Sequence, residues 1–173
     1  MSKTLIAFFS RADENYFGGA MRYVKVGNTE IVVNSMKDML TADIFKIEMK
    51  EPYSPGYMTC IDQAKKHLRS NARPELVSLP DRVDEYDTII LGYPNYWGTM
   101  PMAVFTFLEA FDFSGKTILP FCTNEGSGMG KSEKDIKNTC NGANVAKGLA
   151  IRGSKAADAE NDVKKWLAKN GVI

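Results

Sequence analysis

The sequence predicts an α/β fold of three layers, in which helices cover both faces of one parallel β-sheet. Five short apolar runs alternate with five segments that can form helices, and this order is typical of such folds. Right-handed crossovers between successive parallel strands make the arrangement doubly wound. No linker rich in Pro, Gly or Ser divides the 173 residues, so we expect a single domain over residues 1–173.

The five apolar runs are the predicted strands, at residues 5–9, 44–47, 88–92, 117–122 and 145–151. The first, third and fourth are apolar almost throughout, which predicts central strands that are buried on both faces. The second lies in the segment DIFKIE, where charged side chains alternate with apolar ones. That alternation is typical of an edge strand.

Apolar side chains at helical spacing mark the segments between the strands. The predicted helices cover residues 31–40, 61–68, 101–108 and 132–138, and a last helix carries residues 163–167. Thr29 and Ser154 are candidate N-caps for the first and last helices, and Pro101 suits a first helical turn.

Composition and charge argue against several functions. A net charge of +1 gives no basic field that would favour nucleic acid, and no apolar run is long enough to span a membrane. We find no signal-peptide pattern, so we expect a cytoplasmic protein. The three cysteines show neither C-x-x-C spacing nor nearby histidines, so we expect no disulfide framework and no metal site. The one histidine, His67, stands among basic residues, and we expect it on a solvated helix face.

Ligands of open α/β sheets bind beyond the carboxyl ends of the strands, where the strand order reverses. Three segments rich in glycine and small polar residues follow the predicted strands at that edge, at residues 10–11 with 27–30, 93–101 and 123–132. In the first segment, Asn28 and Thr29 open a helix whose free N–H groups would attract a phosphate. The alternative is that one of these residues serves only as a helix cap.

The other two segments suit a flat conjugated ligand. Tyr96 and Trp97 are adjacent aromatic residues after the third strand, and such a ligand would cover them by stacking. Alternatively, both rings fold back onto the core. After the fourth strand, the glycines between residues 123 and 132 allow main-chain N–H groups to reach the edge of a ligand.

These segments resemble the three FMN-binding loops of the flavodoxin family. The resemblance is carried by Ser10 with Gly27-Asn28-Thr29, by Pro94-Asn95-Tyr96-Trp97-Gly98 and by Thr123-Asn124-Glu125-Gly126-Ser127-Gly128. It covers the whole chain in the order and spacing of elements, and it implies a flavodoxin-like five-stranded parallel sheet in the order 2-1-3-4-5 with FMN as the cofactor. The FMN-binding residues that it implies are Ser10, Arg11, Asn28, Thr29, Pro94, Asn95, Tyr96, Trp97, Gly98, Thr123, Glu125, Gly126, Ser127 and Gly128.

In that family each loop holds one part of the flavin. The first loop would hold the phosphate through Ser10 and residues 28–29, with Arg11 nearby. The second would stack Trp97, or alternatively Tyr96, on the isoalloxazine ring and bring the backbone near Gly98 toward flavin N5. The third would contact the pyrimidine edge of the ring through main-chain groups of residues 125–127.

Two features depart from the pattern of the family. Residues 11–26 separate Ser10 from Gly27, either as a surface bulge that leaves the phosphate seat intact or as a lid that carries Tyr16, Phe17 and Tyr23. The near-neutral charge also differs from that of the strongly acidic electron-carrier flavodoxins, and this weakens the case for long-range steering toward a basic partner.

We therefore expect an FMN-binding electron carrier that works mainly in one-electron steps, without a catalytic acid or base side chain. Its partner would be a redox protein or a small electron donor or acceptor. The alternative is an FMN-dependent NAD(P)H or quinone oxidoreductase on the same fold. A receiver-type signalling domain shares the strand order, but the third strand ends in Gly92-Tyr93-Pro94 and lacks the Asp that such a domain needs.

Overall fold

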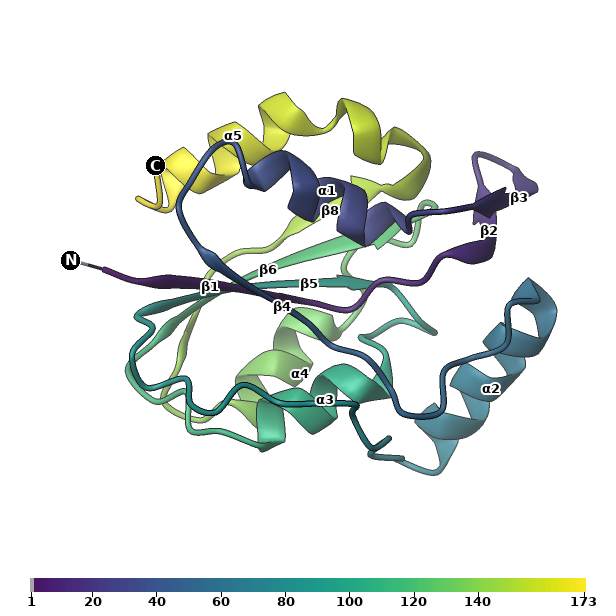
Figure 1. Ribbon diagram of the computed structural model, residues 1–173, viewed down its shortest axis with the longest axis horizontal. Coiled ribbons are helices and arrows are strands. Elements are labelled where there is room, and N and C mark those ends of the chain that lie inside the picture. The colour runs from purple at the N-terminus through teal and green to yellow at the C-terminus, as the bar shows by residue number, and fades with distance from the viewer. Residues whose placement is uncertain (1) are drawn as a thin grey trace.

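A computed structural model describes residues 2–173 and shows a parallel sheet between two layers of helices (Figure 1). The sheet is built, in spatial order, from β4 (Asp43–Lys46), β1 (Thr4–Phe8), β5 (Thr88–Pro94) and β6 (Thr117–Asn124), followed by β7 (Asn144–Val145) and β8 (Leu149–Arg152). All pairs in this sheet are parallel, and β7 and β8 both pair with β6. The predicted order 2-1-3-4-5 is confirmed, with the fifth strand divided into two short pieces.

Pro120 explains why the fifth strand is divided. The Ile118 carbonyl accepts a hydrogen bond from the Ala146 N–H (2.9 Å), and groups two residues apart on a strand point to the same side. Position 120 of β6 therefore faces the neighbouring chain, but proline has no N–H to donate. Pairing stops after Ile118 and resumes at Phe121, where β8 begins.

Helices cover both faces of the sheet. Figure 1 shows α1 (Asn28–Met36) and α5 (Glu160–Lys169) on one side, and α2 (Tyr57–Arg69), α3 (Met102–Glu109) and α4 (Ser132–Thr139) on the other. Alternate residues of β1 supply the two cores, since Leu5 and Ala7 join the cluster under α2 to α4, and Ile6 and Phe8 join the cluster under α1 and α5. The continuous apolar runs of the central strands follow from this two-sided burial.

Two of the predicted helix caps are wrong. Gly27 occupies the N-cap position of α1, and Ala159 occupies that of α5. Ser154 lies inside a short 3-10 helix, η1 (Gly153–Asp158), that precedes α5. Pro101 directly precedes α3, as its fixed φ allows.

Residues 13–24 form an antiparallel hairpin that was not predicted from the sequence. It consists of β2 (Asp13–Phe17) and β3 (Ala20–Val24), which make a separate two-stranded sheet. Gly18 and Gly19 form the two-residue turn, both with positive φ, as a hairpin that matches the strand twist requires. Figure 1 shows the hairpin projecting from the same end of the molecule as the start of α1.

His67 is half-buried, and its Nδ1 lies 2.8 Å from the Tyr53 hydroxyl oxygen, so the expectation of a solvated residue was wrong. The cysteines Cys60, Cys122 and Cys140 are buried and free. No helix within residues 2–173 combines the length and the apolar character that crossing a bilayer requires.

Candidate functional site

A cavity of about 380 Å³ opens at the carboxyl ends of β1, β5 and β6. It lies where the order of the sheet reverses, between β1 and β5, as expected for a ligand site in this kind of fold. Twelve of the fourteen predicted residues line it, namely Ser10, Arg11, Asn28, Thr29, Pro94, Asn95, Tyr96, Trp97, Gly98, Thr123, Glu125 and Ser127. Gly126 and Gly128 lie outside the lining.

The first turn of α1 forms one end of the cavity. Ser10 Oγ accepts the Glu30 N–H (3.1 Å), and Thr29 Oγ1 lies 2.8 Å from Thr123 Oγ1. The N–H groups of Asn28 and Thr29 donate to no acceptor within residues 2–173, and the buried Asn28 Oδ1 has no partner there either. This end of the cavity therefore offers unused donors beside a helix N-terminus, which is the chemistry that binds an anion.

Gly27 shows how residues 12–26 leave this turn undisturbed. A Cβ atom at Gly27 would lie 2.3 Å from Ser10 Oγ and 2.5 Å from the Arg11 carbonyl oxygen. The chain therefore returns at residue 27 to the point that it left at residue 11. The hairpin bulges outward from an intact loop and, in addition, lines the cavity with Asn15 and Tyr16.

Arg11 is a fixed cation in the cavity wall. Its Nη2 donates to the carbonyl oxygens of Ser54 and Pro55, each at 2.8 Å, and its Nη1 donates to the main-chain carbonyl of Glu14 in the hairpin. Within residues 2–173 the guanidinium forms no ion pair with a carboxylate, and its buried Nε has no acceptor. The wall thus retains a positive charge and one unused donor.

The two adjacent aromatic residues behave differently. Tyr96 packs edge-on against Phe9 at a centroid distance of 6.0 Å, and burial holds the pKa of its hydroxyl well above the usual range. Trp97 remains 46% exposed while lining the cavity, and its indole Nε1 donates to the Ile61 carbonyl (2.9 Å). One ring therefore folds back onto the core, and the other is available to a ligand.

The turn that carries Trp97 is held by backbone bonds. Trp97 and Gly98 both have positive φ, at 57° and 87°. The Gly98 N–H donates to Asn95 Oδ1 (2.9 Å), and the Gly98 carbonyl accepts the Lys131 N–H (2.8 Å). An L residue such as Trp97 rarely adopts this conformation, so the turn is strained and depends on these partners.

The loop after β6 is tied to its neighbours through side chains. Glu125 Oε1 accepts the Ser154 N–H (3.0 Å), and Asn124 Oδ1 accepts the Gly126 N–H (2.9 Å). Asn95 Nδ2 donates to the Gly128 carbonyl (2.9 Å), which links the second and third loops. Glu125 and Ser127 face the cavity, whereas Gly126 and Gly128 shape the turn behind them.

One wall of the cavity was not predicted from the sequence. Tyr57, Cys60, Ile61 and Ala64 line it from α2, at the spacing of one helix face. In the sequence, Ile61 and Ala64 indicate only the apolar stripe of the predicted helix over residues 61–68. Burial raises the pKa values of Cys60 and Tyr57, so both side chains keep their protons at neutral pH. Asn15 and Gly153 were missed as well. Tyr16 and Asn124 also line the cavity, although the sequence suggested Tyr16 only as part of a possible lid and Asn124 only as part of the third loop.

Comparison with known proteins decides the family. The family model described as flavodoxin matches residues 20–170 of the chain. The chain belongs to the flavodoxin family. No curated protein matches it significantly.

Solved structures with the flavodoxin architecture agree with this assignment. A candidate flavoprotein from Bacteroides eggerthii superposes with a TM-score of 0.79 at 24% identity, covering 100% of both chains. A candidate flavoprotein from Bacteroides uniformis gives a TM-score of 0.75 at 26% identity, covering 96% of this chain and 98% of the other. A flavoprotein from Lactobacillus acidophilus, solved in complex with FMN, gives 0.63 at 19% identity, covering 96% and 99%.

Proposed function

We propose that this flavodoxin-family protein binds FMN in the cavity and carries electrons through it. The observation that carries the proposal is the joining, in one cavity, of an anion seat at the start of α1 and an exposed aromatic face at Trp97. FMN has a phosphate at one end and a flat conjugated ring at the other, so its two ends match the two ends of the cavity. The FMN in the Lactobacillus acidophilus flavoprotein supports the assignment.

The phosphate fits the seat at α1. A phosphate dianion would accept from the free N–H groups of Asn28 and Thr29 and from the hydroxyl of Ser10, and it would gain from the dipole of α1. The positive charge of Arg11 lies in the same cavity wall without a carboxylate partner. Charge-assisted hydrogen bonds of this kind are about twice as strong as neutral ones.

The ring fits between the second loop and α2. Trp97 would stack on one part of it, and the face of α2 at Tyr57, Cys60 and Ile61 would cover apolar surface of the ring. Tyr16 packs on Tyr57 with ring centroids 6.3 Å apart, so the hairpin supports the same wall. These side chains exclude water from the ring and fix its orientation.

Bound FMN would supply the redox chemistry, accepting and releasing electrons. The residues of the chain position it, because the cavity wall holds few groups that could move a proton. Arg11 and Glu125 are the charged residues in the lining, and Glu125 is already bonded to the Ser154 N–H. Tyr57, Tyr96 and Cys60 have raised pKa values and remain neutral. This supports a carrier without a catalytic acid or base side chain.

The proposal is tested by comparing FMN with riboflavin, which lacks the phosphate. We expect the purified protein to be yellow and the flavin-free protein to bind FMN at least about a hundredfold more tightly than riboflavin, since several charge-assisted bonds are lost without the phosphate. Equal affinity for the two flavins would show that the α1 seat does not hold the phosphate.

An FMN-dependent NAD(P)H or quinone oxidoreductase is the second candidate. The half-exposed ring of Trp97 and the exposed Tyr16 favour it, because they leave aromatic surface at the mouth on which a second flat ring could stack. Stopped-flow mixing of the FMN-loaded protein with NADPH or NADH alone separates the two. Slow reduction in the absence of a partner protein is expected for a carrier, and reduction within seconds would establish the oxidoreductase.

A further inference from the structure

We propose that Arg11 is a fixed cation at the ring end of the cavity and that its charge favours the reduced form of bound FMN. The inference rests on the proposed function and deepens it, because it assigns a residue that sets how readily the flavin accepts electrons. It differs from the expectation drawn from the sequence, which put Arg11 near the phosphate.

The guanidinium of Arg11 lies on the α2 side of the cavity. Its Nη2 donates to the carbonyl oxygens of Ser54 and Pro55, which come just before the N-cap of α2. The first turns of α2 supply Tyr57 and Cys60 to the wall that would cover the ring. Burial raises the pKa values of both side chains, and the positive charge of Arg11 opposes the rise at each. The charge therefore reaches the part of the cavity that we assign to the ring.

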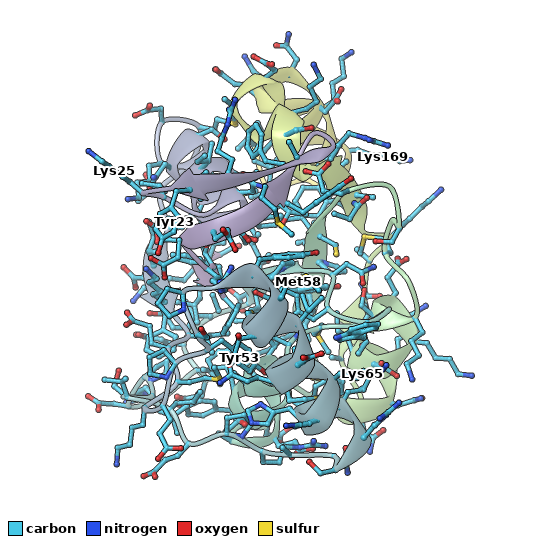
Figure 2. The ribbon with its side chains drawn as sticks, turned by 90° about the vertical axis from the view of Figure 1, so that its right-hand side faces the viewer. Tyr23, Lys25, Tyr53, Met58, Lys65 and Lys169 are labelled. Carbon is cyan, nitrogen blue, oxygen red and sulfur yellow. The ribbon has the colours of Figure 1, made fainter. Side chains whose placement is uncertain are left out.

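The hairpin holds the Arg11 side chain from a second direction. Its Nη1 donates to the Glu14 carbonyl and to Asn15 Oδ1 (3.3 Å), and Asn15 Nδ2 donates to the Arg11 carbonyl (3.0 Å). The Tyr57 N–H donates to Glu14 Oε1 (3.0 Å), so the hairpin and α2 meet around the guanidinium. Figure 2 shows the hairpin next to the first turn of α2, where Met58 is labelled. A charge that is fixed before the ligand arrives needs no reorganisation when the flavin is reduced.

The charge of Arg11 has no carboxylate partner within residues 2–173, because its hydrogen-bond acceptors there are neutral oxygens. Glu125 is the other charged residue of the cavity lining. Its Oε1 accepts the Ser154 N–H, and a Cβ atom at Gly153 would meet both this oxygen and Asn28 Nδ2. The carboxylate therefore lies toward α1, and the cation lies toward α2.

Reduction changes the charge of the flavin ring, which is why a fixed cation matters. At neutral pH the oxidised ring accepts two electrons from a reductant and one proton at N5, so a neutral ring acquires one negative charge, shared by N1 and the C2 carbonyl. A cation in a site of low dielectric stabilises that negative charge and gains little from the neutral ring. Arg11 should therefore strengthen the binding of reduced FMN relative to oxidised FMN, so that weaker reductants can reduce the bound flavin.

The midpoint potential of the bound FMN tests the inference, measured by gradual reduction with dithionite beside a reference dye. Arg11→Gln removes the charge and should weaken the binding of reduced FMN about tenfold relative to oxidised FMN, which lowers the two-electron potential by about 30 mV. Arg11→Lys keeps the charge and should retain most of the wild-type potential. An unchanged potential in Arg11→Gln, or equal losses in the two variants, would overturn the inference. If Arg11→Gln fails to fold, Arg11→Met gives the same comparison with a second neutral side chain.

Lys65→Gln is the matched control for the loss of one positive charge near the site. The Lys65 Nζ lies 4.9 Å from the centroid of the Trp97 ring, but Lys65 does not belong to the cavity lining. This variant should change the relative affinity for reduced FMN less than about twofold, because its charge is carried on a flexible stem outside the cavity. A shift as large as that of Arg11→Gln would contradict the assignment to Arg11.

Riboflavin distinguishes the ring from the phosphate as the partner of Arg11. If the guanidinium acts on the ring, Arg11→Gln should lower the potential of bound riboflavin as much as that of bound FMN. A larger loss of affinity for oxidised FMN than for riboflavin in this variant would place Arg11 at the phosphate and overturn the inference. Failure of the wild-type protein to bind FMN would contradict the proposed function, whereas an unchanged potential in Arg11→Gln would contradict only the role of Arg11.

Discussion

Gly27 is the residue at which the proposed phosphate seat tolerates least change. Its φ of −66° is open to any residue, so the need for glycine comes from space and not from backbone conformation. A methyl group there would meet Ser10 Oγ at 2.3 Å and the Arg11 carbonyl at 2.5 Å. The second of these is a backbone atom that cannot rotate away. The hairpin therefore joins the seat at a contact that only glycine permits.

We expect Gly27→Ala to weaken FMN binding at least tenfold and to lower the free energy of unfolding by about 1–3 kcal/mol, as overpacking does. Gly56→Ala is the matched control, because Gly56 is the N-cap of α2 and has a similar φ of −74°. A Cβ atom at Gly56 would meet no atom nearer than Ser54 Oγ, at 3.6 Å. FMN titration and urea unfolding measure both effects. If the two variants lose equal affinity, the contact at Gly27 is not what shapes the seat.

Gly130 supports the Trp97 turn from behind. A Cβ atom there would lie 2.2 Å from the Gly98 carbonyl oxygen, whereas one at Gly128 would meet nothing within 4 Å. Both glycines have positive φ, so alanine at either costs about 1–2 kcal/mol of backbone strain. We expect only Gly130→Ala to displace Gly98 and Trp97, and so to weaken FMN binding about tenfold beyond Gly128→Ala. Flavin titration of the two variants measures the difference, and equal affinities would contradict it.

At the level of single residues, the loops could be predicted and the α2 wall could not. Trp97 and Glu125 follow directly from their positions at strand ends, and Asn28 follows from its position at the start of a helix. Tyr57 and Cys60 lie on α2, in the connection between β4 and β5. Their spacing is equally typical of a helix face that packs in the core. Only the packing of α2 beside the sheet brings that face to the cavity.

Among the elements, the hairpin of β2 and β3 is the largest that the family resemblance did not predict. It pairs with no strand of the main sheet, and its ends meet at Arg11 and Gly27. Replacing residues 13–25 by a two-glycine link should therefore leave a folded protein that still distinguishes FMN from riboflavin. Loss of Asn15 and Tyr16 from the wall should weaken FMN binding about tenfold, because a tenfold change in affinity matches the free energy of one or two aromatic contacts. Circular dichroism and flavin titration measure both results. Loss of the preference for FMN would show that the hairpin carries the seat.

The sequence contained signals for the hairpin and for the broken fifth strand, but each depends on neighbours. Gly18-Gly19 is a strong turn signal, yet the flanking segments DENYF and AMRYV are too polar to be recognised as strands without the wall that they cover. Pro120 lies within a continuous apolar run, and it interrupts the adjacent strand and not its own. By contrast, two-sided burial of the central strands followed directly from their composition.

At the scale of the whole molecule, the buried thiols should make the free energy of unfolding depend on pH. Burial raises the pKa of Cys122 and of Cys140 to about 12, whereas an unfolded thiol titrates near 8.5. Between these values the folded state retains protons that the unfolded state loses, so the free energy of unfolding should fall as pH rises from about 8.5 toward 12 and be unaffected below. Urea unfolding between pH 7 and 11 measures this. Cys140→Ala should reduce the slope, and a free energy that rises over this range would contradict the prediction.

The most direct test of flavin binding by the whole molecule is a titration of the flavin-free protein with FMN, followed by flavin fluorescence. We predict saturation at about one FMN per chain, with the flavin fluorescence quenched by stacking on Trp97. The Gly56→Ala variant should retain most of this quenching, whereas the Gly130→Ala variant should lose most of it. A signal that rises linearly with added FMN and never saturates would contradict the assignment of this cavity as a flavin site.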